Sequence, residues 1–327
     1  MKRRGFIVAS AAAAAPLAAR AQRSDRLRRI GVLMGLAEDD PEGRERYDAL
    51  RNRLLALGWT EGVNLQITAR WAAGNIARTR TYAEELVGLA PDVIFVNTPP
   101  GLAALQVATT SIPVVFVQVV DASEGVVNSP ARPGGNVTGF YTFFEYAMTG
   151  KWLQLLKEAV PGLRRVAVMQ SPTHPAWPRY LQAIRSVAPS LAIEVIAAPV
   201  RDTAEIERVI ERFAREPDGA LIVLPDSLTT AHRGLVAATA LRHRLPSIGH
   251  IKAFAAAGGL MSYGADLVDL ARQAGTYVDR ILRGAKPSEL PLQGSTQFAL
   301  VVNLGTARAL GLAVPQSIML RADQVIE

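Results

Sequence analysis

Residues 113–120 read PVVFVQVV, a run in which nearly every side chain is apolar and most are β-branched. It lacks the regular polar alternation of a strand that has one face in water. Such a run is typical of a strand that is covered on both faces, as the strands of parallel α/β sheets are. We therefore expect a parallel sheet with helices packed on each side of it.

Short apolar strands alternate with amphipathic helices on either side of this run. Strands are predicted at residues 30–33, 64–69, 93–96, 165–169, 193–197, 220–224, 247–249 and 297–302, and helices at 44–58, 79–89, 101–109, 151–159, 178–187, 203–215, 266–282 and 306–310. Alternation at this spacing predicts parallel sheets. A segment rich in Pro and Gly, residues 130–139, separates two such runs. The predicted fold class is α/β, with two Rossmann-like lobes.

The N-terminal segment predicts export from the cytoplasm. Residues 1–21 combine a basic start, an alanine-rich apolar stretch and a small-x-small site before Gln22, which are the parts of a signal peptide. The apolar stretch is too short and too rich in alanine to hold the chain in a bilayer. Arg3 and Arg4 followed by Gly-Phe-Ile resemble a twin-arginine signal, and a general secretory leader is the alternative.

The composition of the remaining chain agrees with a soluble periplasmic protein. The leader carries four of the 36 basic residues and none of the 29 acidic ones, so its removal lowers the net charge from +7 to +3. Little is then left to attract nucleic acid or an acidic membrane. The chain has no cysteine, which excludes disulfides and lipidation at the cleavage site.

Candidate ligand-binding residues follow from the predicted topology. In open parallel sheets, ligands bind beyond the carboxyl ends of the strands, where helix N-termini point their free N–H groups. The residues that follow the predicted strands are therefore the candidates. They are Met34, Gly35, Thr98, Pro99, Asp121, Gln170, Ser171, Thr173, Asp226, Ser227 and His250.

Some of these candidates have two interpretations. Thr98 precedes two prolines and a glycine, so it is either a helix cap or part of a seat for a carboxylate or another polar group, and the two roles are compatible. Asp121 and Asp226 follow strands, where a carboxylate holds a ligand amine or hydroxyl, or else serves as a turn or cap residue.

Signatures of catalysis are missing from the sequence. Ser262 does not belong to a Gly-x-Ser-x-Gly motif because Leu260 stands where the first glycine should be. The four histidines are far apart and show no His-x-x-x-His spacing. We expect no metal site, no cofactor and no enzymatic activity.

Several segments, in order, match one known family. They are Leu57–Leu65, Pro91–Ile94, Ile112–Phe116, Ala131–Gly139, Leu224–Asp226, Arg242–Pro246, Ala257–Gly264 and Arg321–Glu327. From about Arg28 to the C-terminus, the chain resembles the substrate-binding proteins of ABC transporters in the tryptophan- and tyrosine-binding-like group. These proteins have the type I periplasmic-binding fold.

The resemblance implies two lobes joined by a three-segment hinge, near residues 140–149, 261–265 and 291–296. The N-terminal lobe is expected to comprise residues 27–142 and 263–290, and the C-terminal lobe residues 143–262 and 291–320. The ligand is expected in the cleft between them, where closure about the hinge sequesters it. Tyr263 joins the candidates because it lies on a crossover.

The resemblance also implies the function and its partners. The protein is expected to capture a small polar ligand, an amino acid or a related aromatic or small carboxylate, and to deliver it as a monomer to a membrane permease with its ATPase. Two segments depart from the family pattern, Asp121–Glu124 and Gln170–Thr173, because both lack an Asp-Pro or Asn-Pro pair that many relatives carry. Both fall in the expected cleft, so tryptophan or tyrosine is not carried over as the ligand.

Other functions remain as alternatives. The same protein could present its closed form to a membrane receptor or histidine kinase as a sensor, and neighbouring permease and ATPase genes would favour transport. A secreted α/β enzyme would need a nucleophile, base or metal cluster, which the sequence does not show. A transcription factor of the same fold would need an N-terminal DNA-binding module, and a predicted signal peptide stands there instead.

Overall fold

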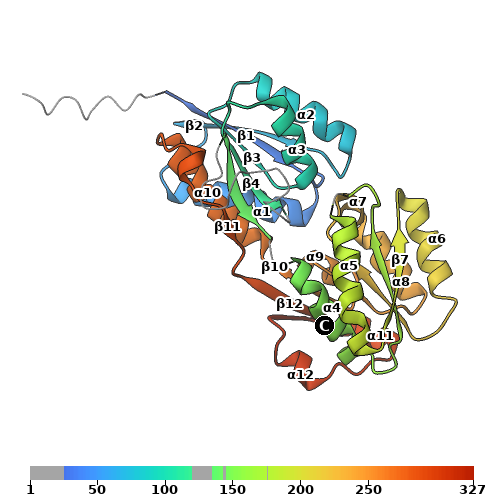
Figure 1. Cartoon of the computed structure of the whole chain (residues 1–327). Coiled ribbons are helices and arrows are strands. Elements are labelled where there is room, and N and C mark those ends of the chain that lie inside the picture. Colours follow the sequence, from blue (N-terminus) through green and yellow to red (C-terminus); the bar gives the residue numbers. More distant parts are fainter. Residues whose placement is uncertain (1–25, 120–134, 143–144, 175) are drawn as a thin grey trace, which may run out of the picture.

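The computed structural model describes residues 26–119, 135–142, 145–174 and 176–327, and in these ranges the chain forms two α/β lobes (Figure 1). The predicted signal peptide and Asp121 lie outside the described residues. The first sheet has the order β11-β5-β4-β3-β1-β2. Its strands are β1 (Arg28–Met34), β2 (Leu65–Trp71), β3 (Val93–Val96), β4 (Val114–Val119), β5 (Val137–Tyr141) and β11 (Gln293–Gly294), and all of their pairings are parallel.

The second sheet has the order β13-β12-β10-β9-β8-β6-β7. Its strands are β6 (Arg165–Gln170), β7 (Glu194–Pro199), β8 (Gly219–Val223), β9 (Ser247–Gly249), β10 (Met261–Ala265), β12 (Phe298–Asn303) and β13 (Gln324–Ile326). Only the pair formed by β10 and β12 is antiparallel. The two parallel-dominated sheets that the sequence predicts are therefore present.

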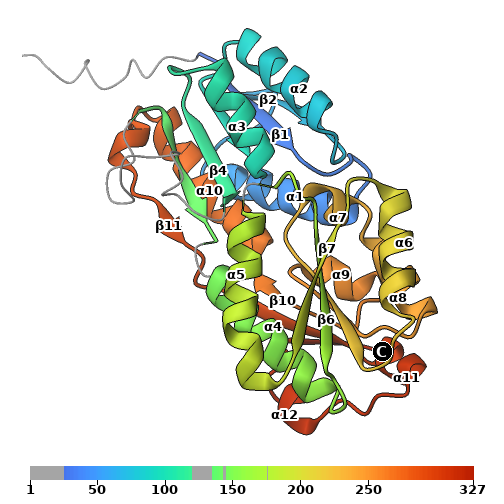
Figure 2. The ribbon, with the colours of Figure 1, turned by 45° about the vertical axis from the view of Figure 1, so that its right-hand side comes forward.

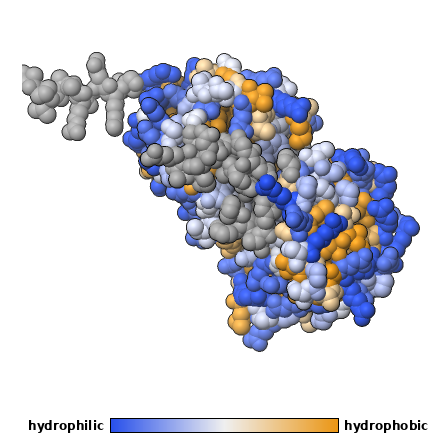
Figure 3. Space-filling view, viewed as in Figure 1, coloured by the Kyte–Doolittle hydropathy of each residue, from blue (hydrophilic) through white to orange (hydrophobic). Residues whose placement is uncertain are grey.

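Helices cover both sheets (Figure 2). The first lobe holds α1 (Pro41–Ala56), α2 (Ile76–Gly88), α3 (Pro99–Ala108) and α10 (Leu267–Leu282). The second lobe holds α4 (Glu145–Ala159), α5 (Trp177–Val187), α6 (Thr203–Phe213), α7 (Ser227–Ala231), α8 (Arg233–Arg242), α9 (Lys252–Ala256), α11 (Leu304–Leu310) and α12 (Gln316–Met319). Hydrophilic residues cover most of the visible surface of both lobes, and each lobe also shows smaller apolar patches (Figure 3).

The strand β4 shows how the sequence builds the first lobe. Val114, Val115 and Phe116 are fully buried, as expected for a strand with helices on both faces. The pairing of β4 with β5 then shifts between Phe116 and Val119. Gln118 lies within this irregularity and has a φ of +64°, in the left-handed region that a residue with a Cβ rarely adopts. The strand thus ends in a bulge that carries its one polar side chain.

The chain crosses between the lobes at places that differ slightly from the expected boundaries. Residues 263–265 were expected in the first lobe, but they belong to β10, which pairs with β9 and β12 in the second sheet. Residues 293–294 were expected in the second lobe, but as β11 they pair with β5 in the first sheet. The backbone hydrogen bonds of these short strands set the boundaries, and such short segments have no hydrophobic period to reveal them.

The last part of the chain completes both lobes. The helix α10 returns to the first lobe and packs against α1, where Arg53 Nε donates to Thr276 Oγ1 at 3.1 Å. Nearby, Trp59 Nε1 donates to Asp279 Oδ1 at 2.8 Å. The strand β13 adds an edge to the second sheet beyond residue 320, where that lobe was expected to end. Among the described helices, none is long and apolar enough to cross a membrane.

Candidate functional site

A polar cavity lies between the two lobes. The space free of atoms there is about 490 Å³, a figure that includes space open to solvent. The first lobe lines it with Gly35, Leu36, Arg46, Asn97, Thr98, Pro99 and Gln118, and the second with His174, Pro225, Asp226, Ser227 and Thr230. Most of these residues lie at or just beyond the carboxyl ends of strands, which is where the parallel topology places a ligand.

The structure brings only part of the sequence-predicted set to this cavity. Gly35, Thr98, Pro99, Asp226 and Ser227 line it. The side chain of Met34 is instead buried in the core. Ser171 and Thr173 share a hydrogen bond of 2.8 Å between their hydroxyls and do not reach the lining.

The other predicted residues also serve the fold in this structure. Gln170 is buried, and its Nε2 donates to the carbonyl of Pro225 at 2.5 Å. His250 is buried as well and does not line the cavity. The ring of Tyr263 packs against Phe298 with a centroid separation of 6.4 Å. Tyr263 lies within a strand of the second sheet, so its side chain is held by that sheet rather than at the crossover that follows.

Several lining residues are not among the candidates given above, namely Leu36, Arg46, Asn97, Gln118, His174, Pro225 and Thr230. Leu36 and Asn97 follow strands and fall under the same topological rule, as does Pro225. Gln118 carries its own signal, because it is the one polar residue in the apolar run that forms β4. Arg46 carries none, since it is one of several arginines in an amphipathic helix.

The loops after β1 and β3 pack closely at the edge of the cavity. A Cβ at Gly35 would lie 2.2 Å from Thr98 Cγ2, so only glycine fits there without displacing the threonine. The backbone N–H of Gly35 donates to Asn97 Oδ1 at 2.8 Å. This bond fixes the orientation of the Asn97 amide, whose Nδ2 has no partner among the described residues although the side chain is only 1% exposed.

The two helix N-termini that face the cavity are already capped. Thr98 Oγ1 accepts from the backbone N–H of Gly101 at 3.3 Å, and Pro99 and Pro100 have no N–H to offer. Asp226 Oδ1 accepts from the backbone N–H groups of Leu228 and Thr229 at 2.8 and 3.1 Å. Thr98 therefore acts as a cap, and the start of α3 does not offer the free N–H groups that a carboxylate seat would need.

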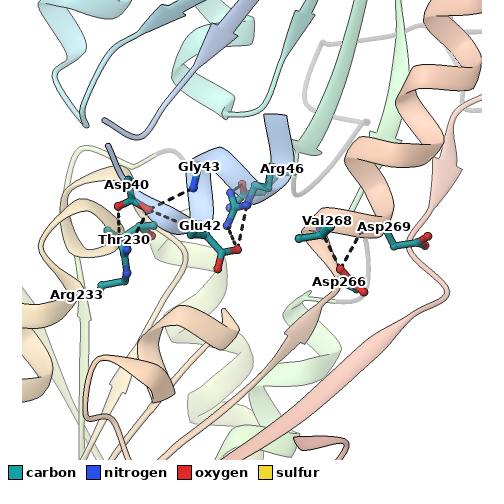
Figure 4. Close-up of polar contacts among 10 residues, drawn as sticks. Asp40, Glu42, Gly43, Arg46, Thr230, Arg233, Asp266, Val268 and Asp269 are labelled. Atoms are coloured by element: carbon teal, nitrogen blue, oxygen red, sulfur yellow. Dashed lines mark hydrogen bonds and ion pairs between the residues drawn. The ribbon is translucent and has the colours of Figure 1, made fainter. Parts of the chain in front are cut away.

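A buried ion pair supports the first-lobe side of the cavity. Arg46 is 2% exposed, and its Nε and Nη2 donate to Glu42 Oε1 at 3.1 and 2.7 Å (Figure 4). Its Nη1 donates to Gln118 Oε1 at 3.2 Å. Because Glu42 lies one turn before Arg46 on α1, the helix itself holds the pair together.

A second ion pair joins the two lobes. Arg233 donates from Nη1 to Asp40 Oδ2 at 2.6 Å and from Nη2 to Asp40 Oδ1 at 3.0 Å, which is a bidentate arrangement (Figure 4). Asp40 is also the N-cap of α1 and accepts from the N–H groups of Glu42 and Gly43. A Cβ built on Gly74 would lie 3.0 Å from Ala231 Cβ, so the loop after β2 also contacts α7 of the other lobe. The lobes are thus in contact beside the cavity.

The pKa values of the two histidines near the cavity are lowered, mainly by burial. Burial lowers the pKa of His174, and the nearby Asp226 carboxylate partly opposes this effect. Burial, with smaller contributions from the charges of Arg46 and His174, lowers the pKa of His250 to about 3. Within the described residues, no cluster of three or more His, Asp or Glu is placed to hold a metal ion.

Two α/β lobes that meet over a polar cavity define a bilobal ligand-binding protein. The family model of ABC transporter substrate binding proteins matches residues 31–326, and the chain belongs to this family. Its relatives bind substrates rather than transform them, which confirms the expectation that this protein is not an enzyme.

The individual relatives agree with the expected group within the family. The chain is 25% identical over 256 residues to a tyrosine-binding protein of Clostridioides difficile (strain R20291), which covers 78% of this chain and 73% of the relative. A conserved domain protein from Vibrio cholerae has a TM-score of 0.83 at 26% identity and covers 92% of this chain and 100% of that one. An ABC domain from Streptococcus pneumonia in complex with L-Trp has a TM-score of 0.80 at 24% identity, with 91% and 100% covered. The expected type I periplasmic-binding fold is confirmed.

Proposed function

We propose that this protein is the periplasmic component of an ABC transporter that captures an amino acid or a related small carboxylate between its lobes and delivers it to a membrane permease. The observation that carries the proposal is the cavity, which polar side chains from both lobes line together. A relative named for binding tyrosine and a related structure in complex with L-Trp support this ligand class. The signal peptide predicted at residues 1–21 supports export to the periplasm.

The proposed mechanism is capture by closure. In the open form the ligand reaches the strand ends of one lobe, and closure then brings the second half of the lining onto it. The bidentate contact of Asp40 with Arg233 forms only when the lobes meet, so it contributes to the closed form whatever the ligand is. The permease receives the closed form because both lobes then present one continuous surface.

Asp226 is the proposed partner of a ligand amine. Its Oδ1 is occupied by two backbone N–H groups, while no described residue donates to its Oδ2. The carboxylate lines the cavity and is 9% exposed, so a ligand ammonium there would be paired in a largely dry site. Asp226→Asn keeps the cap acceptor and removes the charge, and it should weaken binding of an amine-bearing ligand by about 1–3 kcal/mol.

The experiment that tests the function identifies the ligand directly. Native mass spectrometry of the protein purified without denaturation from its own periplasm should show a bound mass that is lost on gentle activation. A thermal-shift panel of metabolites then checks the result, since a ligand at about 100 times its Kd adds about 2.7 kcal/mol of stability. If no mass is bound and no panel member raises the melting temperature, the binding proposal is wrong.

A further inference from the structure

Two residues with side-chain amides lie at neighbouring strand ends in the wall that the first lobe contributes to the cavity. Asn97 directly follows β3, and Gln118 lies near the end of the neighbouring strand β4. Both line the cavity. Because β3 and β4 are parallel neighbours, with Val96 paired to Phe116, their carboxyl ends bring these amides to the same edge of the sheet.

Each amide has its oxygen already occupied by a group that can only donate. Asn97 Oδ1 accepts from the backbone N–H of Gly35, and Gln118 Oε1 accepts from the guanidinium of Arg46. An N–H donor cannot bond to an NH2 group, so these partners dictate which way each amide faces. What remains for the cavity is a pair of NH2 donors, from Asn97 Nδ2 and Gln118 Nε2.

The free donors need an acceptor. Asn97 Nδ2 is buried and unpaired within the described part of the chain, and a buried donor without a partner is costly. The backbone of Gln118 is in the left-handed region, with a φ of +64°. Backbone strain of this kind is concentrated at functional sites. No described residue accepts from Gln118 Nε2 either.

The other groups of the first lobe that could bind a ligand anion are at least partly occupied. The start of α3 is closed by Thr98 and by two prolines that lack N–H groups. The guanidinium of Arg46 donates from all three nitrogens, to Glu42 and Gln118, and the charge of Glu42 neutralises it. Three of the five N–H groups of Arg46 are used in this way, so the two amides share this wall with the remaining two N–H groups of a guanidinium whose charge is already compensated.

From this arrangement we infer that Asn97 and Gln118 together form the seat for the ligand carboxylate. A carboxylate accepts only, so its two oxygens match two NH2 groups. Asp226 faces the same cavity from the second lobe and takes the amine. The first lobe thus binds the carboxylate of a zwitterionic ligand, and the second lobe binds its ammonium group. The inference rests on the proposed function and deepens it, because it assigns the recognition of the acid to the first lobe alone.

Two nearly isosteric substitutions test the seat. Asn97→Asp keeps the acceptor for Gly35 and Gln118→Glu keeps the acceptor for Arg46, so both variants retain the bonds that hold the fold and lose only the NH2 donors. Asn52→Asp, on the exposed face of α1, makes the same chemical change away from the cavity. The probes are L-tyrosine and L-tryptophan with their amines tyramine and tryptamine, which lack the carboxylate, and calorimetry measures each affinity.

We expect each acid variant to lose about 30-fold or more in affinity for the amino acids, because an acceptor then faces the ligand carboxylate. The same variants should bind the amines as well as the wild-type protein does or better, and Asn52→Asp should match the wild type for every probe. An equal loss of affinity for the amino acids and the amines would indicate that the substitutions disrupt the cavity, and it would contradict the proposed carboxylate site.

The outcomes separate this inference from the function on which it rests. If the wild-type protein binds the amino acids and both acid variants bind them equally well, the amide pair is not the seat but the binding proposal stands. If the wild-type protein binds the amines as tightly as the amino acids, no seat for a carboxylate exists. If it binds none of the four probes, the ligand class is wrong and the inference fails with it.

Discussion

Arg46 and Arg233 are both held by carboxylates in largely buried sites, yet the two ion pairs differ in what they connect. The partner of Arg46 is Glu42 on the same helix, whereas the partner of Arg233 is Asp40 on the other lobe. The pair of Arg46 therefore persists when the lobes separate, and that of Arg233 is lost. The pair of Arg46 stabilises one lobe, and the pair of Arg233 stabilises the closed arrangement of the two lobes. Both carboxylates nevertheless lie at the start of α1, with Asp40 as its N-cap and Glu42 in its first turn.

The largest expected effect comes from breaking the pair within the lobe. Arg46→Met leaves the Glu42 carboxylate buried without its partner, and such a loss costs about 3–5 kcal/mol of stability. Chemical denaturation of the ligand-free protein measures it. Arg51→Met on the exposed face of α1 is the matched control, and as a surface pair it should change stability by no more than about 1 kcal/mol. If both substitutions lowered stability by the same amount, the ion pair of Arg46 with Glu42 would not be a main contributor to the stability of the lobe.

The buried His250 predicts how the stability of the folded protein depends on pH. The pKa of His250, about 3 in the folded protein, lies below its ordinary value of about 6.5, so the unfolded chain binds a proton in that window and the folded one does not. Stability should therefore fall as the pH drops from 6.5 towards 3. Between pH 6.5 and 4.5 the wild type should lose about 2 kcal/mol more than His250→Gln. Parallel denaturation curves for the two proteins at both pH values would show that His250 does not contribute.

Breaking the pair between the lobes should act on binding rather than on folding. Arg233→Gln leaves Asp40 in place as the cap of α1 and removes the bidentate contact. The open form should therefore become more stable relative to the closed form by about 1–2 kcal/mol. Ligand affinity should then fall about 5- to 30-fold, and small-angle scattering should show a larger radius of gyration without ligand. Arg242→Gln, which breaks an exposed pair within the second lobe, should leave both quantities unchanged. If Arg233→Gln lowered the free energy of unfolding by more than it lowered the free energy of ligand binding, the pair would serve folding rather than closure.

The smallest net effect is expected at Gln118. Gln118→Gly relieves the left-handed backbone but also removes the acceptor of Arg46 Nη1, so the two effects oppose each other and stability should fall by no more than about 2 kcal/mol. Affinity for the amino-acid ligand should nevertheless fall about 10-fold, because the amide donor is gone. Gln66→Gly on the exposed face of β2 is the opposite case, with a stability loss of about 0.5–1 kcal/mol and unchanged affinity. Scanning calorimetry and titration calorimetry measure the two quantities.

The sequence predicted the fold well because strands with helices on both faces must be apolar along their whole length. Val114 to Phe116 show this relation directly, since the apolar run at these positions is fully buried. The hinge was harder to predict. The two residues of β11 form a strand only because β5 lies beside them, and no local pattern in the sequence reports a neighbour that is about 150 residues away.

The cavity was predictable only where topology alone positions a residue. Gly35, Thr98 and Asp226 follow strands, so the rule for parallel sheets brought them to the lining. Arg46 lies in the middle of a helix, and nothing in its surroundings distinguishes it from Arg44 or Arg53 before the lobes are assembled. His250 follows a strand but is buried, and its backbone packs so closely on Gly264 of β10 that a Cβ there would lie 1.8 Å from the His250 carbonyl oxygen.

The return of α10 to the first lobe has a consequence for how the protein is made. The apolar side of α1, with Leu50 and Leu54, is buried against a helix that begins more than 200 residues later. At about 5–20 residues per second, the ribosome needs roughly 10 to 40 s to produce that helix after α1 has emerged. The first lobe stays unfinished during this time while the second is being synthesised. Until α10 has been made, the apolar side of α1 lacks the helix that covers it in the folded protein.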